Sequence, residues 1–292
     1  MTEVLERKGS SKNIWKSVDD DGEVSEVHFV FSDRVSVFDI GPMVVPFTGL
    51  GQLRCAIAGK IFKVLESQGF ETHYLSHDIS TGRMYVKPVN IPALTPPVDY
   101  GASAKGIILP VELLCRLALT DKFMSRVERG EIDRQQVERL TTFGDWREGS
   151  RLDPPFIECS TKFETADRYL SDSEAVEVIA ETLTIPVPFR KTDHDWLIDY
   201  CYHDVKHLFR FLYQFFKSSG FLLMDGKVEA ALTNLNHIMF VDSISPDELR
   251  LIGPDGRSYD KDPVREWYKD TFPDWYAELL SVKAAFPGDN SK

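Results

Sequence analysis

Polar and apolar residues alternate in the first part of the chain, which is the pattern of half-buried β-strands. Residues 12–18 and 23–31 flank the turn sequence DDDG, and this arrangement predicts a β-hairpin. Every second residue of the later stretch is apolar, at Val27, Phe29 and Phe31. The beginning of the chain is therefore expected to be β-rich.

Apolar residues recur at helical spacing in other parts of the chain. These predicted helices cover residues 51–69, 171–183 with Ser171 or Ser173 as the N-cap, 193–220 ending at Gly220, and 262–286 with a break at Pro273. Further strands are expected at 84–89 and 106–117. Together these elements predict an α+β fold.

Residues 88–106 are rich in proline and small residues, which indicates a linker or hinge. We therefore expect two lobes. Residues 1–105 would form a small β-rich lobe, and residues 106–292 would form a larger α+β lobe.

A second hairpin is predicted from residues 221–232 and 237–242. Side chains alternate across a strand, so Asp225, Lys227 and Glu229 share one face. A four-residue loop, 233–236, would place Lys227 opposite Asp242 on that face. The hairpin would thus bring together three carboxylates and one ammonium group.

Carboxylates this close repel one another unless a cation lies among them. Mg²⁺ prefers one or two carboxylates together with phosphate oxygens and water, so the pattern suits a magnesium–nucleotide site. A solvated polar face, in which Lys227 pairs with its neighbours, is the alternative.

Two short segments suggest anion binding. The small residues Gly9, Ser10 and Ser11 would let backbone N–H groups approach phosphate oxygens, and Lys12 would add positive charge. Arg34, just after an apolar strand, can hold a carboxylate or phosphate through two hydrogen bonds. The alternative for Arg34 is a capped turn with a surface ion pair.

The net charge of -12 argues against nucleic acid or an anionic membrane as a partner, because both attract basic surfaces. No apolar run reaches about 18 residues, so no transmembrane segment is expected. The four cysteines are scattered and form no CxxC pair, which favours reduced thiols in a cytoplasmic protein. His203 and His207 have a zinc-binding spacing, but they fall on the predicted polar face of their helix.

Seven segments, taken in order, resemble the SAICAR synthetase family (phosphoribosylaminoimidazole-succinocarboxamide synthase). They are KGSSKNIW, FSDRVSVFD, LPVELLCR, PPFIECSTK, GFLLMDGKVEAAL, VDSISPDELRL and SYDKDPVREW. The resemblance implies a two-lobed fold of the ATP-grasp or kinase-like kind, in which the small lobe covers ATP. It also implies a ligase that activates a carboxylic acid as an acyl phosphate and joins it to an amine, with release of ADP and phosphate.

The resemblance further implies roles for individual residues. Gly9, Ser10, Ser11 and Lys12 would contact ATP phosphates, Ala104, Lys105 and Gly106 would meet adenine through backbone groups, and Glu229 and Asp242 would hold Mg²⁺. Asp225 and Lys227 would be catalytic, with Lys227 stabilising the transferred phosphoryl group. The substrate residues would be Arg34, Ser36, Asp39, Glu112, Arg116, Thr161, Lys162, Asp247 and Arg250. Small-molecule substrates are the expected partners, and self-association is left open.

The chain departs from the family pattern mainly on the acceptor side. Ser10 replaces a lysine, Leu50 replaces a second lysine, and the sequence LALTDKFM after Arg116 lacks the family's Gly-Ser. Each lost charge-assisted contact would remove about 1.5–3 kcal/mol of affinity for a ribotide phosphate. We therefore expect a repurposed ligase acting on another acid, as in antibiotic or other specialised-metabolite biosynthesis.

Three alternatives stay open at this point. The chain would be a genuine SAICAR synthetase of purine biosynthesis, a nucleotide-binding homologue without turnover, or a phosphotransferase that uses the same metal platform and needs no amine.

Overall fold

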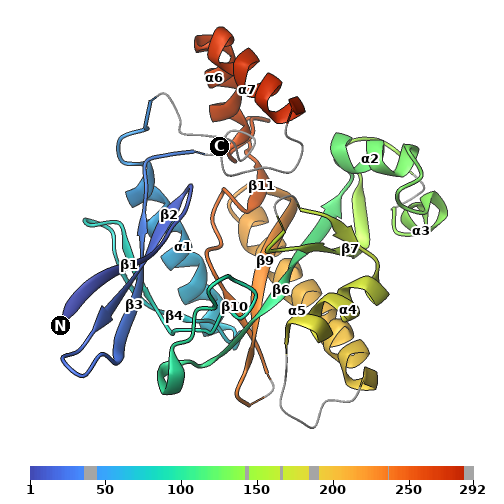
Figure 1. Cartoon of the computed structure of the whole chain (residues 1–292). Helices are drawn as coiled ribbons and strands as arrows, with labels where there is room; N and C mark the ends of the chain where they lie inside the picture. Colours follow the sequence, from blue (N-terminus) through green and yellow to red (C-terminus); the bar gives the residue numbers. More distant parts are fainter. Residues whose placement is uncertain (36–44, 142–144, 165–166, 184–190, 236, 286–292) are drawn as a thin grey trace.

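The computed structural model describes the chain except for residues 36–44, 142–144, 165–166, 184–190, 236 and 286–292. Within the described residues, the strands form two antiparallel sheets with helices packed against them, so the predicted α+β class is confirmed (Figure 1). No helix in this part of the chain is long and apolar enough to cross a membrane.

The first sheet has the strand order β1-β2-β3-β5-β4. Its strands are β1 (Thr2–Lys8), β2 (Lys12–Val18), β3 (Val24–Phe31), β4 (Tyr74–Asp78) and β5 (Arg83–Val86). The predicted hairpin is confirmed, since β2 and β3 pair from Lys12 opposite Phe31 to Val18 opposite Val24. The Asp19 carboxylate closes the turn by accepting hydrogen bonds from the backbone N–H groups of Asp21 and Glu23.

Helix α1 (Leu50–Ser67) covers this sheet with an apolar stripe that includes Cys55, Ala58 and Phe62. The helix occupies most of the predicted range 51–69. A short 3-10 helix, η1 (Gly101–Ser103), lies in the segment between the two sheets.

The second sheet has the order β10-β9-β6-β7-β8, with β11 also paired to β9. Its strands are β6 (Gly106–Ala118), β7 (Arg151–Thr161), β8 (Tyr169–Leu170), β9 (Leu222–Thr233), β10 (Ile238–Val241) and β11 (Leu249–Ile252). Helices α4 (Asp172–Thr182) and α5 (Lys191–Lys217) pack on one face of it. The close approach of α5 requires Gly226, because a Cβ there would lie 2.6 Å from the Phe209 ring.

The remaining helices lie at the edges of the molecule (Figure 1). They are α2 (Asp121–Glu128), α3 (Arg134–Glu138), α6 (Asp262–Thr271) and α7 (Pro273–Ala285). The break between α6 and α7 falls at Phe272, next to the predicted Pro273. Ser171 caps α4 in a reciprocal arrangement with Glu174, which confirms one of the two predicted caps.

The predicted register of the second hairpin is wrong by one residue. Glu229 pairs with Val241, and the Thr233 N–H donates to His237, so the loop is shorter than four residues. Asp242 follows the end of β10 and is not paired opposite Lys227. The division into lobes 1–105 and 106–292 remains a prediction, although the two sheets lie on either side of it in sequence.

Candidate functional site

One face of the second sheet carries charged side chains, and the helices cover the other face. Strand β9 contributes Asp225, Lys227 and Glu229, which share this face as predicted. Their partners across β6 include Arg116 and Glu112, because Asp225 pairs with Arg116 and Glu229 pairs with Glu112. The sheet register therefore assembles acids and bases from two strands into one charged surface.

Asp242 reaches this surface through an unusual backbone conformation. Its φ of 66° is the only positive value among the described residues other than glycine, and it turns the chain sharply after β10. The Asp242 carboxylate accepts a hydrogen bond from Lys12 Nζ at 2.9 Å, and Lys12 also contacts Ser243 Oγ at 2.9 Å. In the observed register of β9 with β10, an extended Asp242 would point its carboxylate to the opposite face of the sheet. The turn directs the carboxylate back to the charged face.

The Asp242 backbone is held by a histidine from the first sheet. His73 Nε2 lies 2.8 Å from the Asp242 carbonyl oxygen, and a carbonyl only accepts, so Nε2 carries the proton. Burial lowers the pKa of His73 to about 4, which leaves the imidazole neutral near pH 7. Backbone hydrogen bonds between residues 71–73 and Phe240 fasten the same segment alongside β10.

Glu229 and Asp242 form an acidic pair, and each carboxylate has a lysine partner. Lys162 forms an ion pair with Glu229. Burial and the nearby Asp242 raise the pKa of Glu229, although Lys162 opposes this. Burial also acts against ionisation of Asp242, but Lys12 and Lys162 hold the pKa of that carboxyl well below its usual range.

The acidic pair lies where two cavities meet. A cavity of about 160 Å³ is lined by Ser10, Ser11, Lys12, Lys227, Glu229, Asp242 and Glu248, among others. A narrower cavity of about 80 Å³ also reaches Glu229 and Asp242, and it continues past Phe29 to residues 86–89. A third cavity, of about 180 Å³, shares Lys227 and Glu248 with the first and extends to Arg116, Asp225 and Arg250.

The residues expected to meet adenine lie beside the narrow cavity. The Lys105 N–H donates to the Pro88 carbonyl, and the Gly106 carbonyl accepts from the Asn90 N–H. Ala104 accepts a hydrogen bond from the Asn234 side chain. These backbone groups are thus partnered within the protein, while Pro88 and Val89 line the cavity itself.

The acidic pair has the chemistry that a magnesium ion requires. The Glu229 and Asp242 carboxylates line the same two cavities, and each forms an ion pair with one lysine. Mg²⁺ commonly binds one or two carboxylates and completes its coordination with phosphate oxygens and water. Among the described residues, no group of three His, Cys, Asp or Glu side chains is arranged to hold a metal without such additional ligands.

The part of the charged face around Arg116 is more completely paired. Arg116 donates to Glu158 at 2.9 Å, to Asp225 at 2.8 Å and to the Tyr169 hydroxyl at 3.2 Å. Glu158 accepts a second guanidinium, from Arg126, at 2.6 Å. Although burial disfavours its charge, Asp225 and Glu158 raise the pKa of Arg116 above its usual value.

Lys227 lies on the charged face between the acidic pair and the surroundings of Arg116. It donates to Glu112 at 2.7 Å. Burial works against its charge, but Glu112 raises the pKa of Lys227 above its ordinary range. Because Lys227 lines both the 160 Å³ and the 180 Å³ cavities, it is placed to contact groups in either.

The other predicted substrate residues are distributed around these cavities. Arg250 lies 3.8 Å from Asp225, and Asp247 lies 2.7 Å from Arg54. Arg34 donates to the Gly9 carbonyl, and Thr161 accepts from the Arg168 N–H, so both are engaged locally. Ser36 and Asp39 lie outside the described residues. Of the two histidines with zinc-binding spacing, His203 is exposed and the His207 ring packs against Phe70.

Several residues at these cavities have no role in the sequence-based prediction. Arg54, His73, Glu248 and Lys261 line one or more of them. Arg54 carries a usable signal, because it falls on the apolar stripe of α1 between Gly51 and Cys55. His73 carries none, since its importance arises only from the packing of one sheet against the other.

The two antiparallel sheets bring Ser10, Ser11 and Lys12 into one cavity with Glu229 and Asp242, which is the arrangement that we expect of an enzyme that uses a nucleotide. Residues 5–281 match the family model described as SAICAR synthetase. The chain therefore belongs to the SAICAR synthetase family, whose members are ATP-dependent carboxylate–amine ligases.

Named relatives agree with this assignment. The chain is 30% identical over 278 residues to a putative phosphoribosylaminoimidazole-succinocarboxamide synthase of Archaeoglobus fulgidus, covering 87% of this chain and 76% of the relative. It is 27% identical over 271 residues to the synthase of Thermoplasma volcanium, covering 90% and 81%.

Solved structures share the fold. A type-2 SAICAR synthetase in complex with ADP superposes with a TM-score of 0.64 at 22% identity, covering 91% of this chain and 95% of that one. The Saccharomyces cerevisiae SAICAR synthase complexed with SAICAR gives 0.63 at 20% identity, covering 92% and 84%. The expected SAICAR synthetase-like fold is thereby confirmed.

Proposed function

We propose that this protein catalyses the SAICAR synthetase reaction, in which ATP, a phosphoribosylaminoimidazole carboxylate and aspartate yield an amide, ADP and phosphate. The acidic pair carries the proposal: Glu229 and Asp242 share one space with Lys12 at the junction of two cavities. The named relatives support this reaction over the specialised-metabolite pathway, which none of their names suggests.

The first half-reaction moves the γ-phosphoryl group of ATP to an oxygen of the acid. Glu229 and Asp242 would hold Mg²⁺, which supplies charge neutralisation to the triphosphate when bound. Ser10, Ser11 and Lys12 line the same cavity and would contact phosphate oxygens. Lys227 would lie beside the transferred group, where its ammonium opposes the charge that builds up.

The second half-reaction joins the activated acid to the amine. The nitrogen lone pair attacks the acyl carbon, the carbon–oxygen bond to phosphate breaks, and the nitrogen loses its proton. Lys162 lines the 80 Å³ cavity and Asp247 lines the 160 Å³ cavity, and this cation and anion would suit the two charged groups of an amino acid donor. Holding both reactants in adjoining cavities lowers the entropic cost of bringing them together.

Product analysis tests the proposal. The protein is incubated with Mg·ATP, aspartate and the ribotide carboxylate, and ADP and the succinocarboxamide product are quantified. We expect ADP and product in equal amounts, with neither formed when aspartate or the ribotide is omitted. ADP release that is independent of the amine would contradict amide ligation.

A second candidate differs only in the acid. It is favoured by the pairing of Arg116, whose guanidinium contacts two carboxylates and a phenol, so it offers little to a ribose phosphate. The missing lysines at Ser10 and Leu50 point the same way. A screen of acids without a phosphate group, read by amine-dependent phosphate release, separates the two: faster turnover than with the ribotide would favour another acid.

A further inference from the structure

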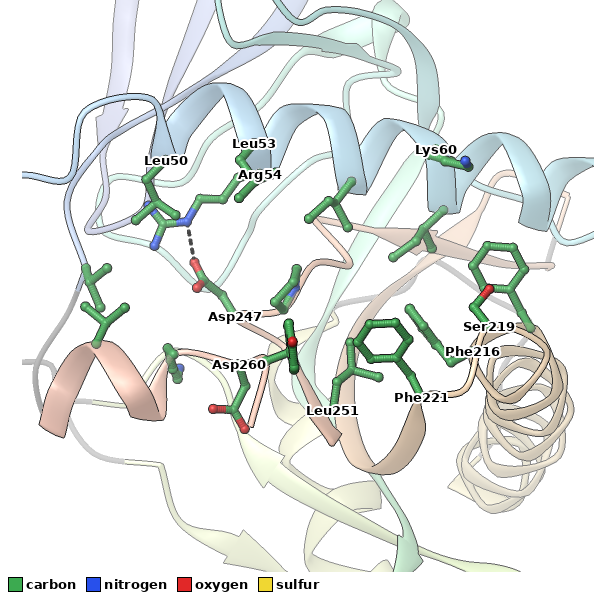
Figure 2. Close-up of a pocket in the computed structure, with 18 residues that line it drawn as sticks. Leu50, Leu53, Arg54, Lys60, Phe216, Ser219, Phe221, Asp247, Leu251 and Asp260 are labelled. Carbon is green, nitrogen blue, oxygen red and sulfur yellow. Dashed lines mark ion pairs between the residues drawn. The ribbon is translucent and has the colours of Figure 1, made fainter. Parts of the chain in front are cut away.

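A cavity of about 440 Å³ adjoins the proposed reaction site and shares Arg54, Asp247 and Lys261 with its 160 Å³ cavity (Figure 2). It lies between α1, the end of α5, β11 and the residues that precede α6. Apolar side chains form most of its wall, including Leu50, Leu53, Phe216, Phe221 and Leu251. Its volume falls in the range of about 300–1,000 Å³ that is common for small-molecule sites.

One end of this cavity is polar and adjoins the reaction cavity. Arg54 Nε and an Asp247 carboxylate oxygen lie 2.7 Å apart, and both residues line the two cavities. Figure 2 shows this ion pair between α1 and the segment that carries Asp247. The Arg54 guanidinium also donates to the carbonyls of Ser32 and Arg34, so its position is fixed. The ion pair therefore separates an apolar space from a charged one.

The charges around the cavity are unequal. Asp247 is matched by Arg54, and Asp260 lies 3.9 Å from Arg250. Lys60 and Lys261 also line the cavity, and no ion pair to either side chain occurs within the described residues. In a protein with a net charge of -12, two such ammonium groups at one apolar cavity favour an anionic ligand.

The apolar wall extends to the surface. The Leu53 side chain is 55% exposed and the Tyr259 side chain is 46% exposed, and both belong to the lining. Exposed apolar groups that continue into a cavity are typical of ligand sites, because a bound ligand removes them from water.

We propose that this cavity binds an amphipathic organic anion, with an aromatic or branched aliphatic body against the Leu and Phe side chains and a carboxylate or sulfonate near Lys60, while Lys261 adds positive charge. The ligand would be distinct from ATP and from the two reactants. Apolar contact would supply most of the affinity, and the ammonium groups would discriminate against neutral analogues.

The test uses two dyes that differ in charge. 8-Anilinonaphthalene-1-sulfonate is an aromatic anion, and N-phenyl-1-naphthylamine is its uncharged analogue. Titration calorimetry of the full chain is expected to show one site for the anion, with Kd below about 100 µM, or about −5.5 kcal/mol. Calorimetry avoids interference from energy transfer when a tryptophan is introduced.

Two pairs of variants locate the dye. Leu53→Trp would fill the mouth of the cavity and weaken binding at least tenfold, whereas Leu75→Trp, at an equally exposed leucine of β4, would not change it. Lys60→Gln would weaken binding of the anion about threefold and leave the neutral dye unaffected. Lys63→Gln, on the same helix but outside the lining, is the matched control.

The outcomes decide the proposal independently of the proposed reaction. Absent binding, equal affinity of the Leu53→Trp and Leu75→Trp variants, or equal effects of Lys60→Gln and Lys63→Gln would overturn it. The Glu229→Ala variant is expected to bind the dye as tightly as the unchanged protein, because Glu229 does not line this cavity. Loss of turnover with retained dye binding therefore bears on the reaction alone.

Discussion

The charged face has two halves, which we propose to bind the nucleotide (the nucleotide half, at Glu229 and Asp242) and the acceptor acid (the acceptor half, at Arg116), and they neutralise their carboxylates in different ways. In the nucleotide half, Glu229 and Asp242 each have one lysine partner. In the acceptor half, the Arg116 guanidinium contacts Glu158, Asp225 and Tyr169 together. One half is held by flexible ammonium groups and the other by a planar guanidinium with its donors engaged.

The two kinds of pairing differ in how easily a carboxylate can exchange its cationic partner for a ligand. An ammonium group is a point charge on a flexible stem. A metal ion can therefore take its place beside the carboxylate, or a phosphate can become its new partner, at a modest cost in free energy. Removing the Arg116 guanidinium would leave Glu158 with Arg126 alone and Asp225 with Arg250 at 3.8 Å, so two largely buried carboxylates would lose their shared partner. The nucleotide half is therefore suited to ligand exchange, and the acceptor half contributes mainly a fixed framework.

The acidic pair provides the largest expected effect. Replacing Glu229 or Asp242 with alanine removes half of the proposed Mg²⁺ ligation and leaves Lys162 or Lys12 unpaired. We expect ADP formation to fall by at least about 10³-fold, or about 4 kcal/mol of transition-state stabilisation. Steady-state assays at saturating Mg·ATP measure this.

An exposed acid is the control for that loss. Glu128→Ala, on α2 and outside the cavities, should turn over as the unchanged protein does. If either acidic-pair variant kept wild-type turnover, Glu229 and Asp242 would not be needed to bind Mg·ATP. The proposed difference between the two halves would then be wrong.

Arg116 tests the acceptor half. Arg116→Ala removes the shared partner of Glu158 and Asp225 but leaves Arg126 and Arg250 beside them, so we expect the free energy of unfolding to fall by about 3 kcal/mol. Urea unfolding measures the loss, and Arg129→Ala, at an exposed Arg–Glu pair, should cost less than about 1 kcal/mol.

The kinetic result sharpens the comparison. If Arg116→Ala retained full stability but raised KM only for a phosphorylated acid, Arg116 would be a substrate ligand and not part of the framework. The two halves would then be equally adapted to ligands.

Local signals predicted a large share of this fold. The DDDG turn located the β2–β3 hairpin, and Ser171 located the start of α4, because both depend on hydrogen bonds within a few residues. Alternation along β9 correctly placed Asp225, Lys227 and Glu229 on one face. The strands β1, β4, β7, β8 and β11 were not predicted.

Long-range geometry accounts for the errors at the site. The register of β9 with β10 was predicted with one loop residue too many, and such a shift reverses the face of every later side chain. Asp242 nevertheless reaches the predicted surface, because its left-handed backbone turns the chain again. That conformation depends on contacts with Lys12 and His73, which are about 230 and 169 positions away in sequence.

Glu248 gives a pH-dependent test of the nucleotide half. Burial, together with Asp247 and Asp242, raises the pKa of Glu248 to about 7, although Lys12 opposes the shift. A raised carboxyl pKa stabilises the fold fully below the unfolded value near 4.5, and this contribution is lost as the pH rises through 7. Glu248→Gln should remove that dependence.

The measurement compares unfolding free energies of the two proteins without added metal. Between pH 4.5 and 8, the unchanged protein should lose about 3 kcal/mol relative to Glu248→Gln. If the unfolding free energies of the two proteins changed in parallel with pH, the pKa of Glu248 would not be raised by folding. Lys12 would then offset the effect of burial on Glu248 fully.

The smallest expected effect concerns His73, which lines the narrow cavity and holds the backbone of one member of the acidic pair. Its Nε2–H donates to the carbonyl of Asp242, the residue with the left-handed backbone. His73→Leu removes that donor and leaves the carbonyl unpaired, so the carboxylate should be less well directed toward the proposed metal. We expect about a tenfold weaker apparent affinity for Mg²⁺ in the ADP-forming assay, or about 1.4 kcal/mol.

His73→Gln places an amide N–H near the same position and should recover most of the affinity, whereas a purely steric role would leave both variants equally impaired. Equal impairment would mean that Lys12 alone fixes Asp242, and the nucleotide half would then lack the backbone support that this hydrogen bond provides.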